Sequence, residues 1–265
     1  MINQFFSATQ QLINYINFNG EKFKHFETLS PQDQSKLVEE ICSMTRNMSL
    51  ISHALKHHID WSGAFSFEWY NHLCDLYYQF PMGNNSHWIE RGVFSNFVIK
   101  NNANVLELCC GDGFFSHHFY ATKARKVTSL DFDEGAILSA QKNYGSNKKL
   151  NFIKADIRKE IPESKYDNIV WDAAIEHFTE DEISNILSTI KSSLNENGVL
   201  SGQTIKNNGI EKQLEHHEKE FESKEEIKIL LEKFFKHVVV LETVHADRHN
   251  FYFFASDEFL PFSSI

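Results

Sequence analysis

The chain has 265 residues, of which 42% are hydrophobic and 14% aromatic, so it can bury a core and is too apolar for a disordered protein. Its formal net charge of −10 repels a phosphate backbone, which argues against a nucleic-acid partner. No stretch approaches the about 18 apolar residues of a membrane span, and the four cysteines show no paired ligand spacing. We therefore expect a globular protein of the reducing cytoplasm, without a membrane partner.

The N-terminal region shows the apolar spacing of helices. Leu37 and Ile41, for example, are four residues apart, which places them on one helical face. A run of turn-forming residues over 81–86 marks a candidate boundary or hinge. We predict a helical N-terminal cap over residues 1–96, which shapes a substrate pocket, and a second domain over residues 97–265.

After residue 100 the pattern changes to short β-rich runs that alternate with amphipathic segments, as in βα units with a parallel sheet. Five strands are predicted over Asn104–Leu108, Lys126–Leu130, Leu150–Ile153, Asn168–Trp171 and Gly198–Gly202. Helices are predicted over Glu134–Asn143, over Asp181–Leu194 with Asn197 and Gly198 as its stop, and over Ile227–Phe235. Val238–Val244 and Phe251–Ala255 are predicted to form an antiparallel pair at one edge. The fold class is therefore α/β, with a doubly wound, mostly parallel seven-stranded sheet and a C-terminal antiparallel hairpin.

The most informative stretch is 105–115, where a predicted buried strand runs into a glycine turn and then a helix. Small residues let a ligand approach the backbone there, and the helix N-terminus offers unpaired amides. Asp131 ends the next strand, where a carboxylate can accept both ribose hydroxyls of a nucleoside. Asp156 follows the third strand, where it and the amide of Ile157 could address an adenine edge. Because the carboxyl ends of successive parallel strands meet at one crevice, we expect these acidic groups to converge on one ligand.

A dinucleotide site would use the same geometry. However, the third glycine of its G-x-G-x-x-G pattern is Ser116 here. Glu107 also lies in the turn region, where its charge would repel a pyrophosphate. A cationic ligand suits this carboxylate better.

Together these residues resemble the class I S-adenosylmethionine-dependent methyltransferases, a Rossmann-like family. The family's first motif, acidic-x-Gly-x-Gly-x-Gly, reads Glu107-Leu108-Cys109-Cys110-Gly111-Asp112-Gly113 here, so Cys109 replaces its first glycine. The resemblance covers about residues 97–256 and includes Asp131, Asp156, the fourth strand at 166–170, Glu176 with His177, the fifth strand at 194–200 and the terminal hairpin.

The resemblance implies a binding role for several side chains towards S-adenosylmethionine as cofactor. The methionine part would be held by Glu107 and by the backbone of Cys109, Gly111, Asp112 and Gly113. Asp131 would bind the ribose. Asp156 and Ile157 would bind the adenine, and Phe132 would pack against the adenine ring. Asp172 would face the cofactor, and Arg91 would pair with its carboxylate.

Methyl transfer is an in-line displacement in which the enzyme mainly aligns the nucleophile, so a base is optional. A histidine is the usual proton acceptor for a hydroxyl, because its pKa lies near working pH. We rank His177, which follows the fourth strand, first. His216 lies with His217 on the insertion after the fifth strand, where a solvated charged helix face is the simpler interpretation.

Fourteen histidines also raise the question of a metal. The pairs His57–His58, His117–His118 and His245–His249 have no acidic or cysteine partner at zinc-ligand spacing. We therefore predict no metal site.

The sequence thus predicts a methyltransferase that modifies an oxygen or nitrogen of a small molecule. After the fourth strand stand Trp171-Asp172-Ala173-Ala174 in place of an Asn/Asp-Pro-Pro-aromatic signature, which argues against an amino group on a nucleic-acid base. Two alternatives stay open: a partner subunit that binds S-adenosylmethionine without turnover, and a nicotinamide or flavin oxidoreductase. The sequence also leaves open whether the protein forms a homo-oligomer.

Overall fold

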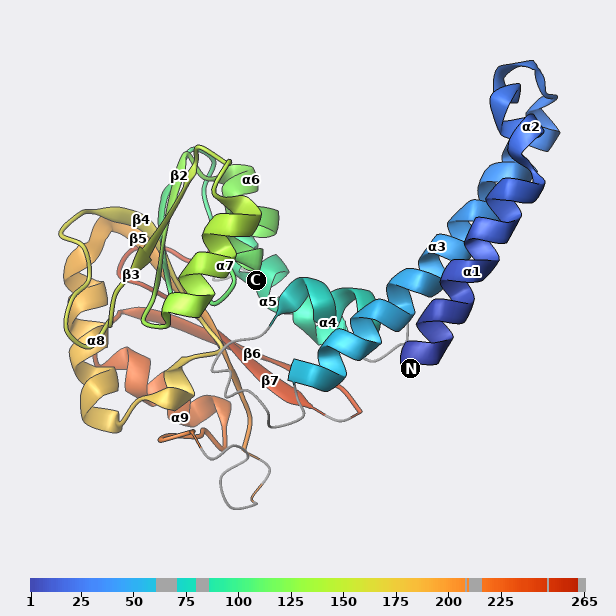
Figure 1. Cartoon of the computed structure of the whole chain (residues 1–265). Helices are drawn as coiled ribbons and strands as arrows, with labels where there is room; N and C mark the ends of the chain where they lie inside the picture. The colour runs from blue at the N-terminus through green and yellow to red at the C-terminus, as the bar shows by residue number, and fades with distance from the viewer. Residues whose placement is uncertain (61–70, 80–85, 208, 210–215, 247, 262–265) are drawn as a thin grey trace. The chain divides into compact units, whose positions relative to one another are not determined.

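The computed structural model describes residues 1–60, 71–79, 86–207, 209, 216–246 and 248–261 (Figure 1). It divides into two compact units, Met1–Ser86 and His87–Ile265. The division lies before the expected boundary at residue 96, because helix α5 (Ser86–Val98) packs mainly with the second unit. Phe94 of α5 stacks on Tyr252 with ring centroids 4.3 Å apart. Most of the turn-forming run over 81–86 lies outside the described residues.

The first unit is helical, as predicted. Its elements are α1 (Ile2–Phe18), α2 (Gly20–Lys24), η1 (Phe26–Thr28), α3 (Pro31–Asp60) and α4 (His72–Gln79). The start of α3 follows from its sequence: the Ser30 hydroxyl accepts the Asp33 backbone N–H at 3.2 Å, and Pro31 takes the first helical position. Within the described residues, none of the helices has both the length and the apolar character needed to cross a membrane. The role of this unit as a cap over a substrate stays a prediction.

The second unit is built on a seven-stranded sheet in the order β3-β2-β1-β4-β5-β7-β6. Strands β1 to β5 are parallel, and β7 lies antiparallel between β5 and β6. Each strand expected from the sequence lies within an observed one, which confirms the fold class. The strands are β1 (Asn104–Leu108), β2 (Lys126–Asp131), β3 (Leu150–Lys154), β4 (Tyr166–Asp172), β5 (Leu194–Ile205), β6 (His237–Val244) and β7 (His249–Ser256).

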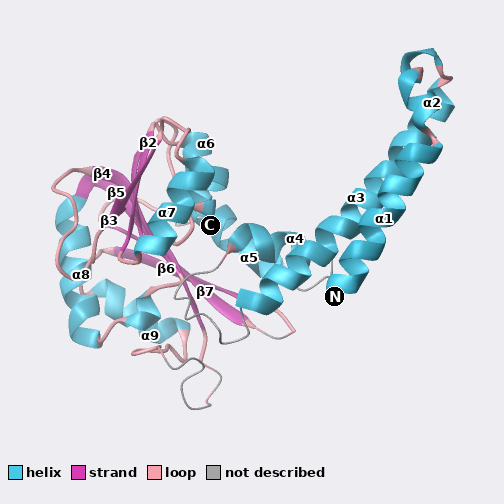
Figure 2. Cartoon of the chain, viewed as in Figure 1, coloured by secondary structure: helices cyan, strands magenta, loops and turns pink. Residues whose placement is uncertain are grey.

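Helices cover both faces of this sheet (Figure 2). One face carries α8 (Glu180–Ser193) and α9 (Lys224–Glu232), and the other carries α5 and α7 (Glu134–Tyr144). Shorter turns of helix are η3 (Ser116–Tyr120), α6 (Ala121–Lys123) and η4 (Ile175–His177). Helix α8 begins in a capping box formed by Thr179 and Glu182 and buries the apolar stripe Ile183, Ile186, Leu187 and Ile190 against the sheet.

The expected stop of α8 at Asn197 and Gly198 is wrong. The helix ends at Ser193, and β5 begins at once with Leu194 paired to Tyr166. The register then shifts, because the next pair is Asn168 with Val199. Asn197 and Gly198 therefore lie in an irregular part of β5, where turn-forming residues favour a β-bulge.

Candidate functional site

The turn after β1 is left-handed at three positions. Cys109, Gly111 and Gly113 have φ values of 58°, 55° and 74°. Glycine adopts this region freely, whereas a side chain there costs about 1–2 kcal/mol, so Cys109 occupies a backbone conformation suited to the glycine it replaces. At Gly113 a Cβ would lie 2.7 Å from a ring carbon of Phe152, so this close approach of turn and β3 requires glycine.

Asp131 connects the carboxyl ends of three strands. One of its carboxylate oxygens accepts the Gly111 backbone N–H at 2.8 Å, and the other accepts the Asp133 N–H at 2.9 Å. Its own carbonyl accepts the Ala155 N–H at 2.8 Å, just before Asp156. The turn after β1, the end of β2 and the end of β3 therefore meet, and the structure brings Glu107, Asp131 and Asp156 to the same edge of the sheet.

Glu107 is buried, with 4% of its surface exposed. Its carboxyl group accepts hydrogen bonds from the hydroxyls of Ser116 and, at 3.0 Å, Ser129. Burial raises the pKa of Glu107 to about 8, although both hydroxyls oppose the rise. Near neutral pH the group is therefore largely protonated, and a cation beside it would favour its ionised form.

Asp172, at the end of β4, is the second buried carboxyl group on this side. It accepts the Tyr120 hydroxyl at 2.6 Å and the Ser95 hydroxyl at 3.2 Å. Burial raises its pKa to about 6, and the charge of Arg91 opposes this rise, as it does at Glu107. The guanidinium of Arg91 lies 4.3 Å from the centroid of the Phe115 ring. Arg91 is thus part of the buried charge network of the crevice.

The residues expected around an adenine differ in their surroundings. The Phe132 side chain is half exposed, as a stacking platform must be, whereas Ile157 is buried. Both oxygens of Asp156 accept hydrogen bonds from Arg158, each at 2.9 Å, and these bonds lower the pKa of Asp156 to about 2. Asp112 is buried and accepts the Phe114 N–H at 3.2 Å. An adenine contact of Asp156 therefore stays a prediction and would have to share its carboxylate with Arg158.

The structure places His177 and His216 together, both of them exposed. Nδ1 of His177 lies 3.2 Å from the backbone carbonyl oxygen of His216. The neighbouring His217 is instead buried, with Nδ1 2.5 Å from a carboxylate oxygen of Glu220. His216 is thus exposed to solvent, as expected of a solvated face. The same expectation is wrong for His217, because its side chain is buried against Glu220.

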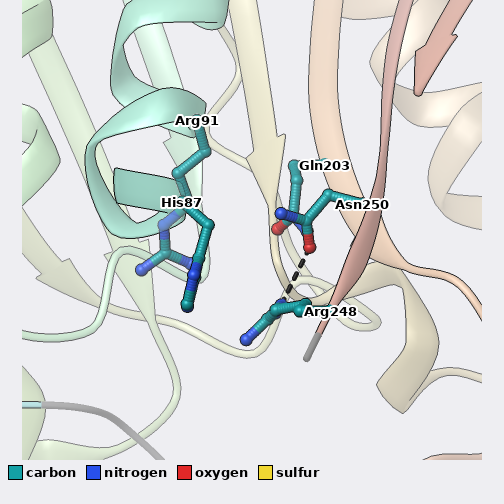
Figure 3. Close-up of a pocket in the computed structure, with 5 residues that line it drawn as sticks. All are labelled: His87, Arg91, Gln203, Arg248 and Asn250. Atoms are coloured by element: carbon teal, nitrogen blue, oxygen red, sulfur yellow. Dashed lines mark hydrogen bonds between the residues drawn. The ribbon is translucent and has the colours of Figure 1, made fainter. Parts of the chain in front are cut away.

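A small cavity lies beside the ends of β4 and β5 (Figure 3). Its empty volume is about 180 Å³, including space open to solvent. Arg248 donates from Nε to the side-chain oxygen of Asn250 at 2.8 Å, and Gln203 donates to the same oxygen at 3.1 Å. Gln203 also pairs with Asp172 across the two strands. The sequence prediction included only Arg91 of the five lining residues, which are His87, Arg91, Gln203, Arg248 and Asn250.

A doubly wound sheet with this strand order, a glycine turn after β1 and acidic residues at the next strand ends defines a Rossmann-like domain. Residues 105–198 match the family model of a methyltransferase domain. Malonyl-[acyl-carrier protein] O-methyltransferase 1 of Ilyobacter polytropus is 29% identical over 109 residues, which cover 41% of this chain and 40% of that protein. The match thus spans less than half the length of this curated relative.

Solved structures share the fold. The N-methyltransferase NodS of Bradyrhizobium japonicum WM9, in complex with S-adenosyl-l-homocysteine, has a TM-score of 0.55 and 16% identity over 68% of this chain and 91% of NodS. The 1,6-didemethyltoxoflavin-N1-methyltransferase of Burkholderia thailandensis has a TM-score of 0.51 and 17% identity over 64% of this chain and 80% of that enzyme. The chain thus shares the Rossmann-like fold of these methyltransferases, and its residues 105–198 match their methyltransferase domain; NodS was solved with S-adenosyl-l-homocysteine bound.

Proposed function

We propose that the protein transfers a methyl group from S-adenosylmethionine to an oxygen or nitrogen of a small molecule. The observation that carries this proposal is the bond between the Asp131 carboxylate and the Gly111 amide, which positions an acid at the end of β2 directly beside the glycine turn. The acidic residues also fit the charge of the ligand, because the Asp131 carboxylate would repel a pyrophosphate and a cation would favour the ionised forms of Glu107 and Asp172.

Each residue has a defined task in this proposal. Asp131 accepts the ribose hydroxyls, Phe132 covers the adenine, and Glu107 with the turn backbone holds the methionine part. Bound S-adenosylmethionine supplies a methyl group on a positively charged sulfur. The residues around the crevice would hold the acceptor atom in line with the methyl group and the sulfur, so that the new bond to carbon would form as the carbon–sulfur bond breaks and the acceptor would release its proton. His177, or His216 beside it, is the predicted proton acceptor.

Calorimetric titration with S-adenosylmethionine and, separately, with NAD tests the cofactor assignment. We expect heat of binding with S-adenosylmethionine, and a loss of about 1–3 kcal/mol in Asp131→Ala, the scale of hydrogen bonds to a charged group. Asp133→Asn is the matched control, because it removes an equal charge two residues away and keeps a good N-cap for α7. Heat with NAD alone, or equal affinities in the wild type and Asp131→Ala, would contradict the assignment.

We further propose that the acceptor carries an acidic group. The cavity beside β4 and β5 combines the guanidinium groups of Arg91 and Arg248, and paired guanidiniums favour a carboxylate. Arg91 is predicted to take the carboxylate of the cofactor, and we assign the Arg248 guanidinium, which lines the same cavity, to the acceptor. The name of the Ilyobacter polytropus relative refers to a malonyl group, which carries a carboxylate. This agrees with an acidic acceptor.

A panel of hydroxylated and aminated compounds, each offered with and without a carboxylate, tests the acceptor class. Formation of S-adenosylhomocysteine should be faster with the carboxylates, and Arg248→Ala should remove this advantage while the affinity for S-adenosylmethionine is kept. Arg91→Ala should instead weaken the affinity for the cofactor. A preference for the neutral compounds, or one that survives in Arg248→Ala, would refute an acidic acceptor.

A further inference from the structure

Three side chains that can bind a metal meet on the other side of the end of β5. Glu176 and His177 belong to η4, after β4, and His217 comes from the segment that follows β5. Each offers one ligand atom, and these atoms all lie within 4.8 Å of one another. The rings of His177 and His217 have centroids 5.0 Å apart. The group is separate from the cavity that contains Arg91 and Arg248.

Backbone contacts fix this group in place. The carbonyl oxygen of Glu176 accepts the N–H groups of Glu218 at 2.7 Å and Lys219 at 3.0 Å. The next residue, His177, contacts the carbonyl of His216. The two segments are therefore held together on both sides of His217, so that the approach of its ring to η4 is a built feature of the fold.

The hydrogen bonds of the two imidazoles leave one nitrogen of each for a ligand. A carbonyl oxygen can only accept, so Nδ1 of His177 carries the hydrogen in its contact with His216, and Nε2 has the free lone pair. Nδ1 of His217 faces the buried carboxylate of Glu220 in the same way. Metal-binding histidines almost always donate their second nitrogen to a carboxylate or a backbone carbonyl, and both partners are present here.

Glu176 adds a buried charge. Only 3% of its surface is exposed, and one oxygen of its carboxylate accepts the Thr204 hydroxyl at 2.9 Å. A hydroxyl is a neutral partner, and a buried carboxylate is stabilised far more by a positive charge. Because His177 is exposed, an ion could reach the group from solvent.

We propose that Glu176, His177 and His217 bind one divalent transition-metal ion of the zinc class. Two imidazoles and one carboxylate are the ligand set of open zinc sites, in which a further position takes water or substrate. With bonds of about 2.0–2.2 Å at tetrahedral angles, two ligand atoms lie about 3.3–3.6 Å apart, so the ligand atoms would move towards one another by up to about 1.5 Å from the observed spacing of up to 4.8 Å. The proposal does not depend on the methyltransferase assignment, and with the ion bound Nε2 of His177 is a ligand, so His216 is then the predicted proton acceptor.

The test is titration of the chelator-treated full chain with Zn²⁺ by calorimetry, and with Co²⁺ by visible absorption. We expect one ion per chain. His177→Ala removes an exposed side chain, so this variant should fold normally and bind Zn²⁺ at least about tenfold more weakly than the wild type. Glu176→Gln should weaken the binding of Zn²⁺ to a similar extent. Glu220→Gln should weaken binding by about 10- to 100-fold through the orientation of His217.

His216→Ala is the matched control. It removes the adjacent exposed imidazole and keeps the backbone carbonyl that His177 contacts, so it should bind Zn²⁺ as the wild type does. Zn²⁺ binding by the other histidines gives a background signal that is equal in His177→Ala and His216→Ala. No binding of Zn²⁺ or Co²⁺, equal binding in the wild type and His177→Ala, or an equal loss in His216→Ala would overturn the proposal. Because Zn²⁺ is titrated without S-adenosylmethionine, these outcomes are independent of the test of the cofactor.

Discussion

Replacement of Glu107 by glutamine should remove a pH dependence of stability. Burial raises the pKa of Glu107 from 4.5 to about 8 in the folded state, so the folded protein binds this proton more tightly than the unfolded chain does. The contribution of Glu107 to stability is therefore fully present below about pH 4.5 and is lost as the pH rises through 8. A difference of about 3.5 pKa units corresponds to a loss of about 5 kcal/mol.

Urea unfolding followed by circular dichroism at pH 5, 6.5 and 8.5 measures this effect. The free energy of unfolding of the wild type should fall relative to that of Glu107→Gln by about 4 kcal/mol between pH 5 and pH 8.5. The charge of Asp172 is one cause of the raised pKa of Glu107, so the difference between the two proteins reports the titration of Glu107 together with its coupling to Asp172. Parallel pH profiles of the two proteins would refute the claim that Glu107 is buried in its protonated form.

Two further substitutions test the turn and the predicted base. Gly113→Ala should lower the free energy of unfolding in urea by about 1–3 kcal/mol more than Gly209→Ala does. Both glycines have a left-handed backbone, but only at Gly113 would the new Cβ press against Phe152. Equal losses of unfolding free energy in the two variants would show that this close approach is unimportant. His177→Ala should lower turnover about 100-fold or more if His177 accepts the proton, with cofactor affinity nearly retained in calorimetry, whereas wild-type turnover would remove this role.

The sheet could be predicted from the sequence because its signals are local. Buried strands such as Asn104–Leu108 and the alternation with amphipathic helices depend only on neighbouring residues. The parallel arrangement of successive strands then brings Asp131 and Asp156 together at their carboxyl ends. The end of α8 was missed, because Asn197 and Gly198 have the same turn-forming signal in a strand bulge as in a helix stop.

The contacts of His217 and Arg248 could not be predicted in this way. His217 is forty-one residues from Glu176, and its partner Glu220 lies in a segment whose charged composition indicates a solvated helix. Arg248 follows β6, far in sequence from Arg91, and only the antiparallel insertion of β7 between β5 and β6 brings it to Gln203. Contacts of this kind depend on the packing of distant segments, which one sequence does not encode in a local pattern.

A crystal structure of the protein with S-adenosylhomocysteine bound tests the central claim most directly. The account predicts both ribose hydroxyls within hydrogen-bond distance of the Asp131 carboxylate, about 2.5–3.0 Å, with the adenine on Phe132 and the methionine part over Cys109 and Gly111. An adenosyl group bound away from the ends of β1 and β2, with Asp131 out of contact, would contradict it.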